Sequence, residues 1–128
     1  MAIAGPAADW PRATVAVPDG VEMVARPTAP DIRIYDFFAE GRTLLGIYLG
    51  DKPSFPPDRP SAQSEDEFVG GIPAKTIVEQ RPTGWSRDLI VRLPPRHAYH
   101  FFYQDLRDRD LALADSIIGS LQIEGASR

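Results

Sequence analysis

The stretch IRIYDFFAEGRTLLGIYL, residues 32–49, contains two runs of β-branched and aromatic residues on either side of a short polar loop. Residues 32–38 and 43–49 each have the composition of a β-strand, and the loop between them includes Gly41, a residue suited to the positive φ of hairpin turns. The stretch therefore predicts a β-hairpin. Because both strands are apolar on both faces, we expect them near the centre of a sheet, with a helix over one face and loops or a partner over the other.

The second decisive segment is an amphipathic pattern at residues 110–121. Its apolar residues recur at spacings of three and four, which is the period of a helix with one buried face: Leu111, Ala114, Ile118 and Leu121, with Leu113 and Ile117 widening the stripe. Asp108 or Asp110 is the expected N-cap, because a carboxylate there also suits the positive end of the helix dipole.

Five further segments have strand character, at residues 14–17, 21–25, 68–80, 88–93 and 98–103. The turn sequence Pro18-Asp19-Gly20 predicts that the first two form a hairpin. Short connections predict that the last three form an antiparallel meander, with alternate residues of 88–93 facing the core.

Together these elements predict an α+β fold, a mostly antiparallel sheet packed by one C-terminal helix. With 128 residues the chain has the size of a single domain, taken here as residues 1–128. Residues 1–13 are expected to form an irregular arm whose Trp10 packs on the edge of the sheet. Residues 51–67, rich in proline and polar side chains, are expected to form a long loop with no regular structure, either a flexible loop or a binding lid.

Composition excludes several classes of function. The net charge is −4 and the basic residues form no cluster, so nucleic acid is not an expected partner. The chain has no cysteine, which excludes disulfides and cysteine-based metal sites. No apolar run approaches the roughly 20 residues that span a bilayer. Twelve of the fourteen basic residues are arginine, which, with plentiful alanine and proline, favours a bacterial source.

The two histidines, His97 and His100, are the first candidates for chemistry. Residues three apart on a strand point to opposite faces, so a shared metal ion is not expected, and a histidine with a hydrogen-bonded ring is the better interpretation. The acidic run at 105–110 could bind a hard cation, but it lacks the pattern of a calcium-binding loop, and capping of the helix explains it better. We predict no metal, no cofactor and no catalytic set.

Aromatic side chains are the second group of candidates. Most of them are expected in the core, but strands 32–38 and 98–103 carry aromatic residues on both faces, so one face could line a groove. The predicted binding residues are Tyr48, Trp85, Tyr99, His100 and Tyr103.

The order of the elements resembles the Mog1/PsbP-like fold family, which includes small bacterial lipoproteins of the LpqN type. The segments that carry the resemblance are Pro18-Asp19-Gly20 after a strand, Asp36-Phe37-Phe38 in a hairpin, residues 69–74 at a strand entry, and the helix at 114–121. The resemblance implies a sandwich around an antiparallel sheet and a non-enzymatic accessory role, often outside the cytoplasm. It carries over no site residues.

The sequence therefore leaves three functions open. The first is a non-enzymatic bacterial binding module that recognises a protein or a small ligand through an aromatic sheet face. The second is a small enzyme that uses His97 or His100 with Asp105 as an acid–base pair. The third is an oligomeric subunit in which a second copy covers an apolar face. The expected location is the periplasm or the exterior if a leader has been removed, and otherwise the cytoplasm.

Overall fold

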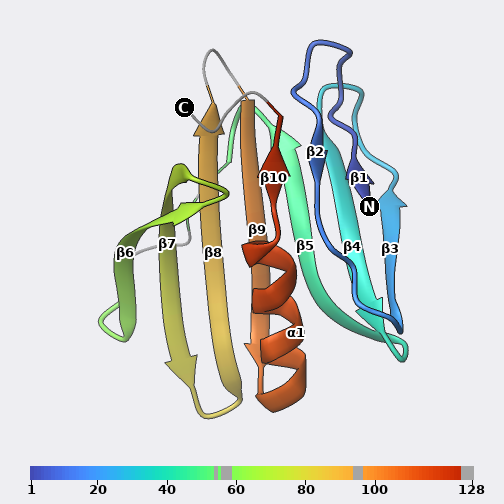
Figure 1. The fold of residues 1–128 in the computed structure, drawn as a ribbon. Helices are drawn as coiled ribbons and strands as arrows, with labels where there is room; N and C mark the ends of the chain where they lie inside the picture. The colour runs from blue at the N-terminus through green and yellow to red at the C-terminus, as the bar shows by residue number, and fades with distance from the viewer. Residues whose placement is uncertain (54, 56–58, 94–96, 125–128) are drawn as a thin grey trace.

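The computed structural model describes residues 1–53, 55, 59–93 and 97–124 of the chain. Its main element is a seven-stranded antiparallel sheet with the strand order β3-β4-β5-β9-β8-β7-β6 (Figure 1). The strands are β3 (Val21–Arg26), β4 (Arg33–Ala39), β5 (Arg42–Gly50), β6 (Ala62–Val69), β7 (Ile72–Arg81), β8 (Gly84–Leu93) and β9 (His97–Leu106). The helix α1 (Asp108–Gly119) packs on one face of this sheet, so the predicted α+β class is confirmed.

The hairpin predicted at residues 32–49 is confirmed as β4 and β5. Its turn is tighter than expected, because only Glu40 and Gly41 separate the strands, both with positive φ, 51° and 77°. Two such residues are typical of the turn whose twist matches that of the flanking strands. The register shifts between Phe37 and Phe38, which leaves Leu44 as an extra residue, and Leu44 is buried in the core.

The predicted meander is also confirmed, as β7, β8 and β9 joined in sequence. Leu89 and Val91 are fully buried on the core face of β8, as their alternation predicts, and Leu93 is partly buried against the same core.

The expectation of an irregular loop at residues 51–67 is wrong for residues 62–67, which belong to β6. This strand is polar and exposed because it lies at the edge of the sheet, so the apolar alternation of a half-buried strand is missing. The turn at Gly70-Gly71 then divides the predicted strand 68–80 between β6 and β7. Residues 54 and 56–58 of the expected loop lie outside the described residues.

A second layer covers the same face of the sheet as α1. It is a small antiparallel sheet of β1 (Ala2–Ile3), β2 (Ala13–Thr14) and β10 (Gln122–Ile123), and Figure 1 shows it in front of the large sheet. The arm expected at residues 1–13 is therefore partly regular. The hairpin expected between residues 14–17 and 21–25 is wrong, because β2 pairs with β1 and β10 while β3 pairs with β4. Burial of Ala13 and Val15 against the core holds the first segment in this layer.

The helix begins two residues earlier and ends two residues earlier than predicted. The expected aspartate N-cap is wrong: the N-cap is Arg107, without a side-chain capping bond. The guanidinium of Arg107 instead donates to the carbonyl oxygens of Pro82 and Thr83 in the β7–β8 turn, and Asp110 forms an ion pair with Arg42, with 3.0 Å between Nη2 and Oδ1. A long-range partner thus takes the side chain of Asp110, which the local pattern assigns to capping. Among the described residues no helix is long and apolar enough to cross a bilayer.

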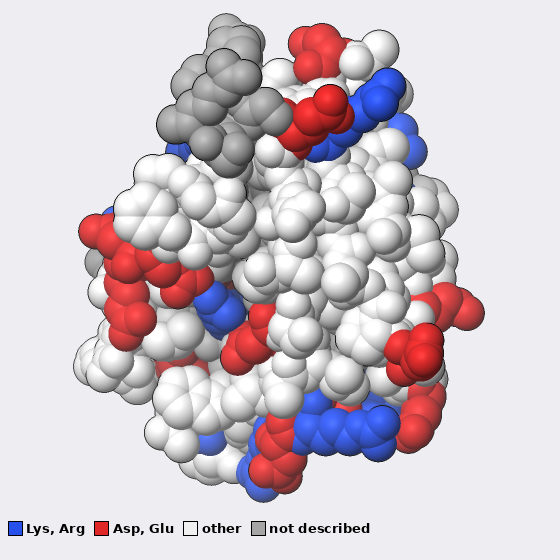
Figure 2. All heavy atoms as spheres, in the orientation of Figure 1, with Lys and Arg blue, Asp and Glu red and all other residues white. Residues whose placement is uncertain are grey.

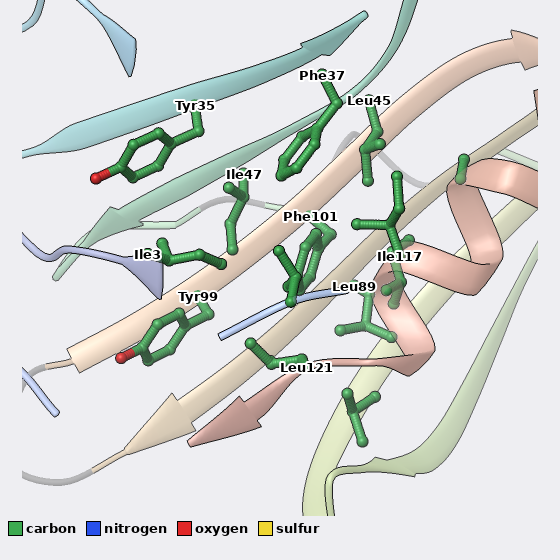
Figure 3. Packing of buried hydrophobic residues seen from close by; sticks show 14 of the residues in the cluster. Ile3, Tyr35, Phe37, Leu45, Ile47, Leu89, Tyr99, Phe101, Ile117 and Leu121 are labelled. Atoms are coloured by element: carbon green, nitrogen blue, oxygen red, sulfur yellow. The ribbon is translucent and has the colours of Figure 1, made fainter. Parts of the chain in front are cut away.

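The hydrophobic core lies between the large sheet and the second layer. Figure 3 shows its aromatic and aliphatic side chains converging from β4, β5, β8 and β9 on the helix residue Ile117 and on Leu121. Ile3 from the N-terminal strand joins the same cluster. Since each fully buried side chain of this size contributes about 1.5–3 kcal/mol, this one cluster holds the sheet, the helix and the N-terminal segment together.

Arg87 links the helix to the outer strands. Its Nη1 lies 2.9 Å from Oδ1 of Asp115 on α1, and its Nη2 forms an ion pair with Glu67 on β6. Its Nε donates to Thr76 on β7, at 3.0 Å. Tyr103 donates to the same Asp115 oxygen, at 2.8 Å. This network therefore fixes where α1 sits along the sheet.

Candidate functional site

The face of the large sheet opposite α1, called the back face from here on, carries a mixed aromatic and polar cluster. The strand register places its members next to one another across β5, β9 and β8, with Tyr48 opposite His100, His100 opposite Ile90, and Phe102 opposite Asp88. We call Tyr48, Asp88, Ile90, His100 and Phe102 the back-face cluster. Ile90 and His100 are buried, whereas Tyr48, Asp88 and Phe102 are only half-buried.

Two glycines of β5 leave room for the ends of two aromatic rings on this face. A Cβ atom on Gly46 would lie 2.5 Å from Cζ of Phe102, and one on Gly50 would lie 2.2 Å from the hydroxyl oxygen of Tyr48. Each ring therefore occupies the space that a side chain would take. Aromatic side chains that cover glycines in this way stabilise a sheet and present a broad apolar surface.

His100 and Asp88 form the polar centre of the cluster. Nε2 of His100 lies 2.7 Å from Oδ1 of Asp88, and the two side chains are only 11% and 24% exposed. An ionised carboxylate accepts hydrogen bonds and does not donate them, so Nε2 carries a proton in this pair. The ring of Phe102 lies edge-on at 5.7 Å and that of Phe55 at 6.4 Å from the imidazole, measured between centroids. The aromatic rings restrict access of water to the pair.

A small polar recess lies beside the cluster, with a volume of about 50 Å³. Its charged lining is built around Glu79, which forms ion pairs with Arg59 at 3.1 Å and with Arg81 at 2.8 Å. The hydrogen bond from Ser61, followed by that from Arg81, lowers the pKa of Glu79 below its ordinary value. The recess has room for ordered water but not for an organic ligand.

The structure divides the five predicted binding residues among several places. Tyr48 and His100 lie side by side on the back face. Tyr99 and Tyr103 lie on the opposite, helix-covered face and are buried. Trp85 lies beside the β7–β8 turn, pairs with Leu106, and is 36% exposed. The five therefore do not form one surface.

The two buried tyrosines use their hydroxyl groups in structural hydrogen bonds. Tyr99 donates to the carbonyl oxygen of Pro11, at 3.2 Å, and burial raises its pKa to about 12. Tyr103 donates to Asp115, and burial raises its pKa as well. Tyr99 therefore connects β9 to the N-terminal segment, and Tyr103 connects it to α1.

The histidines point to opposite faces of β9, as their spacing predicts. The ring of His97 lies 4.5 Å from that of Trp10, and its Nε2 is 3.8 Å from Oδ2 of Asp9. Asp105, the expected acid–base partner, lies at a register shift in β9 and accepts a hydrogen bond from Thr83 at 2.7 Å. The carboxylate beside His100 is that of Asp88, which sequence reasoning missed because the pairing register of β8 and β9 cannot be read from composition.

Metal-ligating side chains do not gather in the part of the chain that the structure describes, where no group of three or more such residues could hold an ion. The carboxylates of the acidic run at 105–110 have separate partners, since Asp105 accepts a hydrogen bond from Thr83 and Asp110 forms an ion pair with Arg42.

A separate cavity of about 1130 Å³ lies in the second layer, between the N-terminal segment and β10. Small and apolar residues line most of it, together with Trp10, and its charged residues are Arg12 and Glu124. None of the predicted site residues lines this cavity. A sequence signal for it exists in the run of small residues before Trp10, but such a run is equally typical of an unstructured arm.

Comparisons with known proteins add no assignment, since no family model, no curated protein and no solved structure matches the chain.

Proposed function

We propose that this protein is a non-enzymatic binding module of the Mog1/PsbP-like type, which recognises its ligand through the back-face cluster. The observation that carries the proposal is the pair of half-exposed rings, Tyr48 and Phe102, whose ends occupy the space beside Gly50 and Gly46. On the other face of the sheet the corresponding aromatic residues are buried in the core. A sheet with helix and strands over one face and an aromatic surface on the other supports a role in binding.

The chemistry of the cluster indicates the class of ligand. Exposed aromatic rings stack on planar apolar groups, such as an aromatic side chain of a partner protein or the apolar face of a sugar. The His100–Asp88 pair stiffens the surface beside them, and its contact already takes up Nε2 of His100 and one carboxylate oxygen of Asp88. We therefore expect contacts through ring faces, with polar contacts at the rim.

The proposal is tested by titrating the ¹⁵N-labelled protein with indole, and separately with a neutral disaccharide, while recording amide spectra. One of the two probes should shift the amides of Tyr48, His100 and Phe102 and leave the helix amides unchanged. Substitution Phe102→Ala should weaken the response about tenfold, the loss of roughly one stacking contact. Phe68→Ala, at an exposed phenylalanine on β6, serves as the matched control.

Gly46→Ala gives a sharper test of the same surface. Its Cβ atom would displace the ring of Phe102 without removing any aromatic side chain. If Gly46→Ala stays folded and retains full binding of the probe, or if neither probe shifts the cluster, the proposed surface is wrong.

The enzymatic alternative keeps one observation in its favour, the 2.7 Å contact between His100 and Asp88. A carboxylate that orients an imidazole is the usual support for a general base. Asp88 would take the role assigned to Asp105. A hydrolase screen with ester and phosphoester substrates, in which Asp88→Asn lowers a measured rate at unchanged stability, would favour the alternative over the binding module.

A further inference from the structure

The two edges of the large sheet are built differently. The edge strand β6 carries Glu65, Asp66 and Glu67 in succession, and Figure 2 shows acidic side chains gathered on that side of the molecule. A row of like charges opposes pairing with a further strand. The opposite edge, β3, has the sequence VEMVAR with no run of like charge, and its Val24 is 41% exposed. Of the two edge strands, only β6 is protected by charge against pairing with a further strand.

The backbone of β3 offers a regular set of outward hydrogen-bonding groups. A two-residue hairpin makes its flanking residues, Ala39 and Arg42, a hydrogen-bonded pair, so the backbone groups of Ala39 point to β5. Because backbone groups alternate in direction along a strand, the N–H and C=O groups of Phe38 and Asp36 point to β3. There they face the backbone groups of Glu22 and Val24. The remaining residues of β3, Met23 and Ala25 among them, direct their N–H and C=O groups away from the sheet.

The side chains of β3 select one register for a second strand. Glu22, Val24 and Arg26 lie on the back face, because they pair with Phe38, Asp36 and Ile34 of β4. In an antiparallel pairing of two copies centred on Val24, Met23 of one copy lies opposite Ala25 of the other, so their outward backbone groups meet. In the same register Glu22 of one copy lies opposite Arg26 of the other. The opposite charges therefore face each other twice across the two-fold axis.

The side chain of Arg26 is exposed and already held in an orientation that suits this contact. Its Nε and Nη2 atoms donate to the two carboxylate oxygens of Asp36, at 2.9 and 2.7 Å, and the side chain is 47% exposed. Nη1 has no hydrogen-bond partner among the described residues, which leaves it available to a further carboxylate. The Asp36 pair also holds the guanidinium in place, which lowers the entropy lost on binding.

We infer that a second copy of this chain pairs antiparallel along β3, with Glu22 against the partner's Arg26, and joins the two seven-stranded sheets into one. The pairing is short, because the N–H of Val21 already donates to Pro18 at 3.1 Å and Pro27 has no N–H group. A short edge contact predicts a dimer that depends on concentration. Both copies of α1 would lie on one side of the joined sheet and both back-face clusters on the other.

The test is sedimentation velocity over micromolar concentrations up to about 1 mM, the range in which weak dimers dissociate. The wild type should shift from monomer to dimer. Glu22→Arg and Arg26→Glu should each weaken the dimer about tenfold, because each places like charges opposite one another twice. An equimolar mixture of the two variants should recover it, because one chain then carries a positive charge at both positions and the other a negative charge at both.

Two controls keep the test independent of folding. Ala25→Pro removes one outward N–H group and leaves the β3–β4 ladder intact, so it should abolish the dimer without changing the circular dichroism spectrum. Arg92→Glu makes the same change of charge as Arg26→Glu at an exposed position on β8, and should leave the dimer unchanged. A wild type that stays monomeric at about 1 mM, or a dimer that survives both Glu22→Arg and Ala25→Pro, would overturn the inference.

Discussion

Nε2 of His100 lies 2.7 Å from Oδ1 of Asp88, on the face of the sheet that α1 does not cover. The two residues belong to neighbouring strands and are not directly opposite, since His100 faces Ile90 and Asp88 faces Phe102. The contact is therefore a diagonal one, which orients the imidazole along the sheet and holds β8 to β9 by side chains as well as by the backbone ladder.

Removal of both partners should cost less than the two single removals added together. Asp88→Ala leaves the buried imidazole N–H without an acceptor, and we expect the free energy of unfolding to fall by about 1–3 kcal/mol. Asp88→Ala combined with His100→Ala should cost less than the sum of the two single changes. Urea unfolding of all four proteins measures the coupling, and strictly additive losses would contradict it.

The raised pKa of Tyr99 predicts a loss of stability at alkaline pH. Burial raises its pKa to about 12 in the folded protein, whereas an exposed tyrosine has a pKa of about 10. Below about pH 10 the residue is protonated in both states, and between the two pKa values only the unfolded state loses its proton. Stability should therefore be lost as the pH rises from about 10 towards 12. Absorbance at the tyrosinate wavelength should show this late titration, and Tyr99→Phe should remove one late-titrating tyrosine while Tyr103, whose pKa burial also raises, remains; an unchanged curve in the variant would argue against the assignment.

Ile117 should be a sensitive position on the helix. Its side chain is fully buried between α1 and the sheet, so Ile117→Ala removes packed atoms and leaves a cavity, a change that costs about 2–5 kcal/mol. Ser116→Ala, at the exposed neighbouring position, should change stability by about 0.5 kcal/mol or less. Thermal or urea unfolding distinguishes the two. Equal effects would mean that α1 is not docked as described.

Two glycines should respond in opposite ways to alanine. Gly84 has a φ of +141°, and a Cβ atom there would lie 2.7 Å from the carbonyl oxygen of Leu106, so Gly84→Ala should destabilise the fold. Gly119 lies in the last turn of α1 with nothing within 4 Å of the added atom, so Gly119→Ala should stabilise it by about 0.5–1 kcal/mol. Unfolding midpoints of the two variants on either side of the wild type would confirm the expectation; shifts of the same sign would contradict it.

The candidate site was predictable only in part. Tyr48 and His100 were identified because aromatic residues on both faces of a strand must place some side chains away from the helix. Their neighbours Asp88 and Phe102 follow from the register of β8, β9 and β5, which depends on bulges and turns elsewhere in the chain. Tyr99 and Tyr103 carry the same sequence signal as His100, and alternation along β9 assigns them to the opposite, buried face.

Local patterns by themselves determined the β4–β5 hairpin, the β7–β9 meander and the helix, because each depends on the spacing of residues close together in the sequence. Tertiary structure alone decided that residues 13–14 join a small sheet with residues 2–3 and 122–123, that the acidic residues 65–67 lie in an edge strand, and that Arg107 precedes α1 without a side-chain cap. The strand β6 forms through its backbone pairing with the neighbouring β7, whereas the small sheet and the start of α1 depend on contacts between residues distant in sequence. Their stabilising energy comes from burial against the core and from partners such as the Pro82 and Thr83 carbonyl groups, which no local pattern contains.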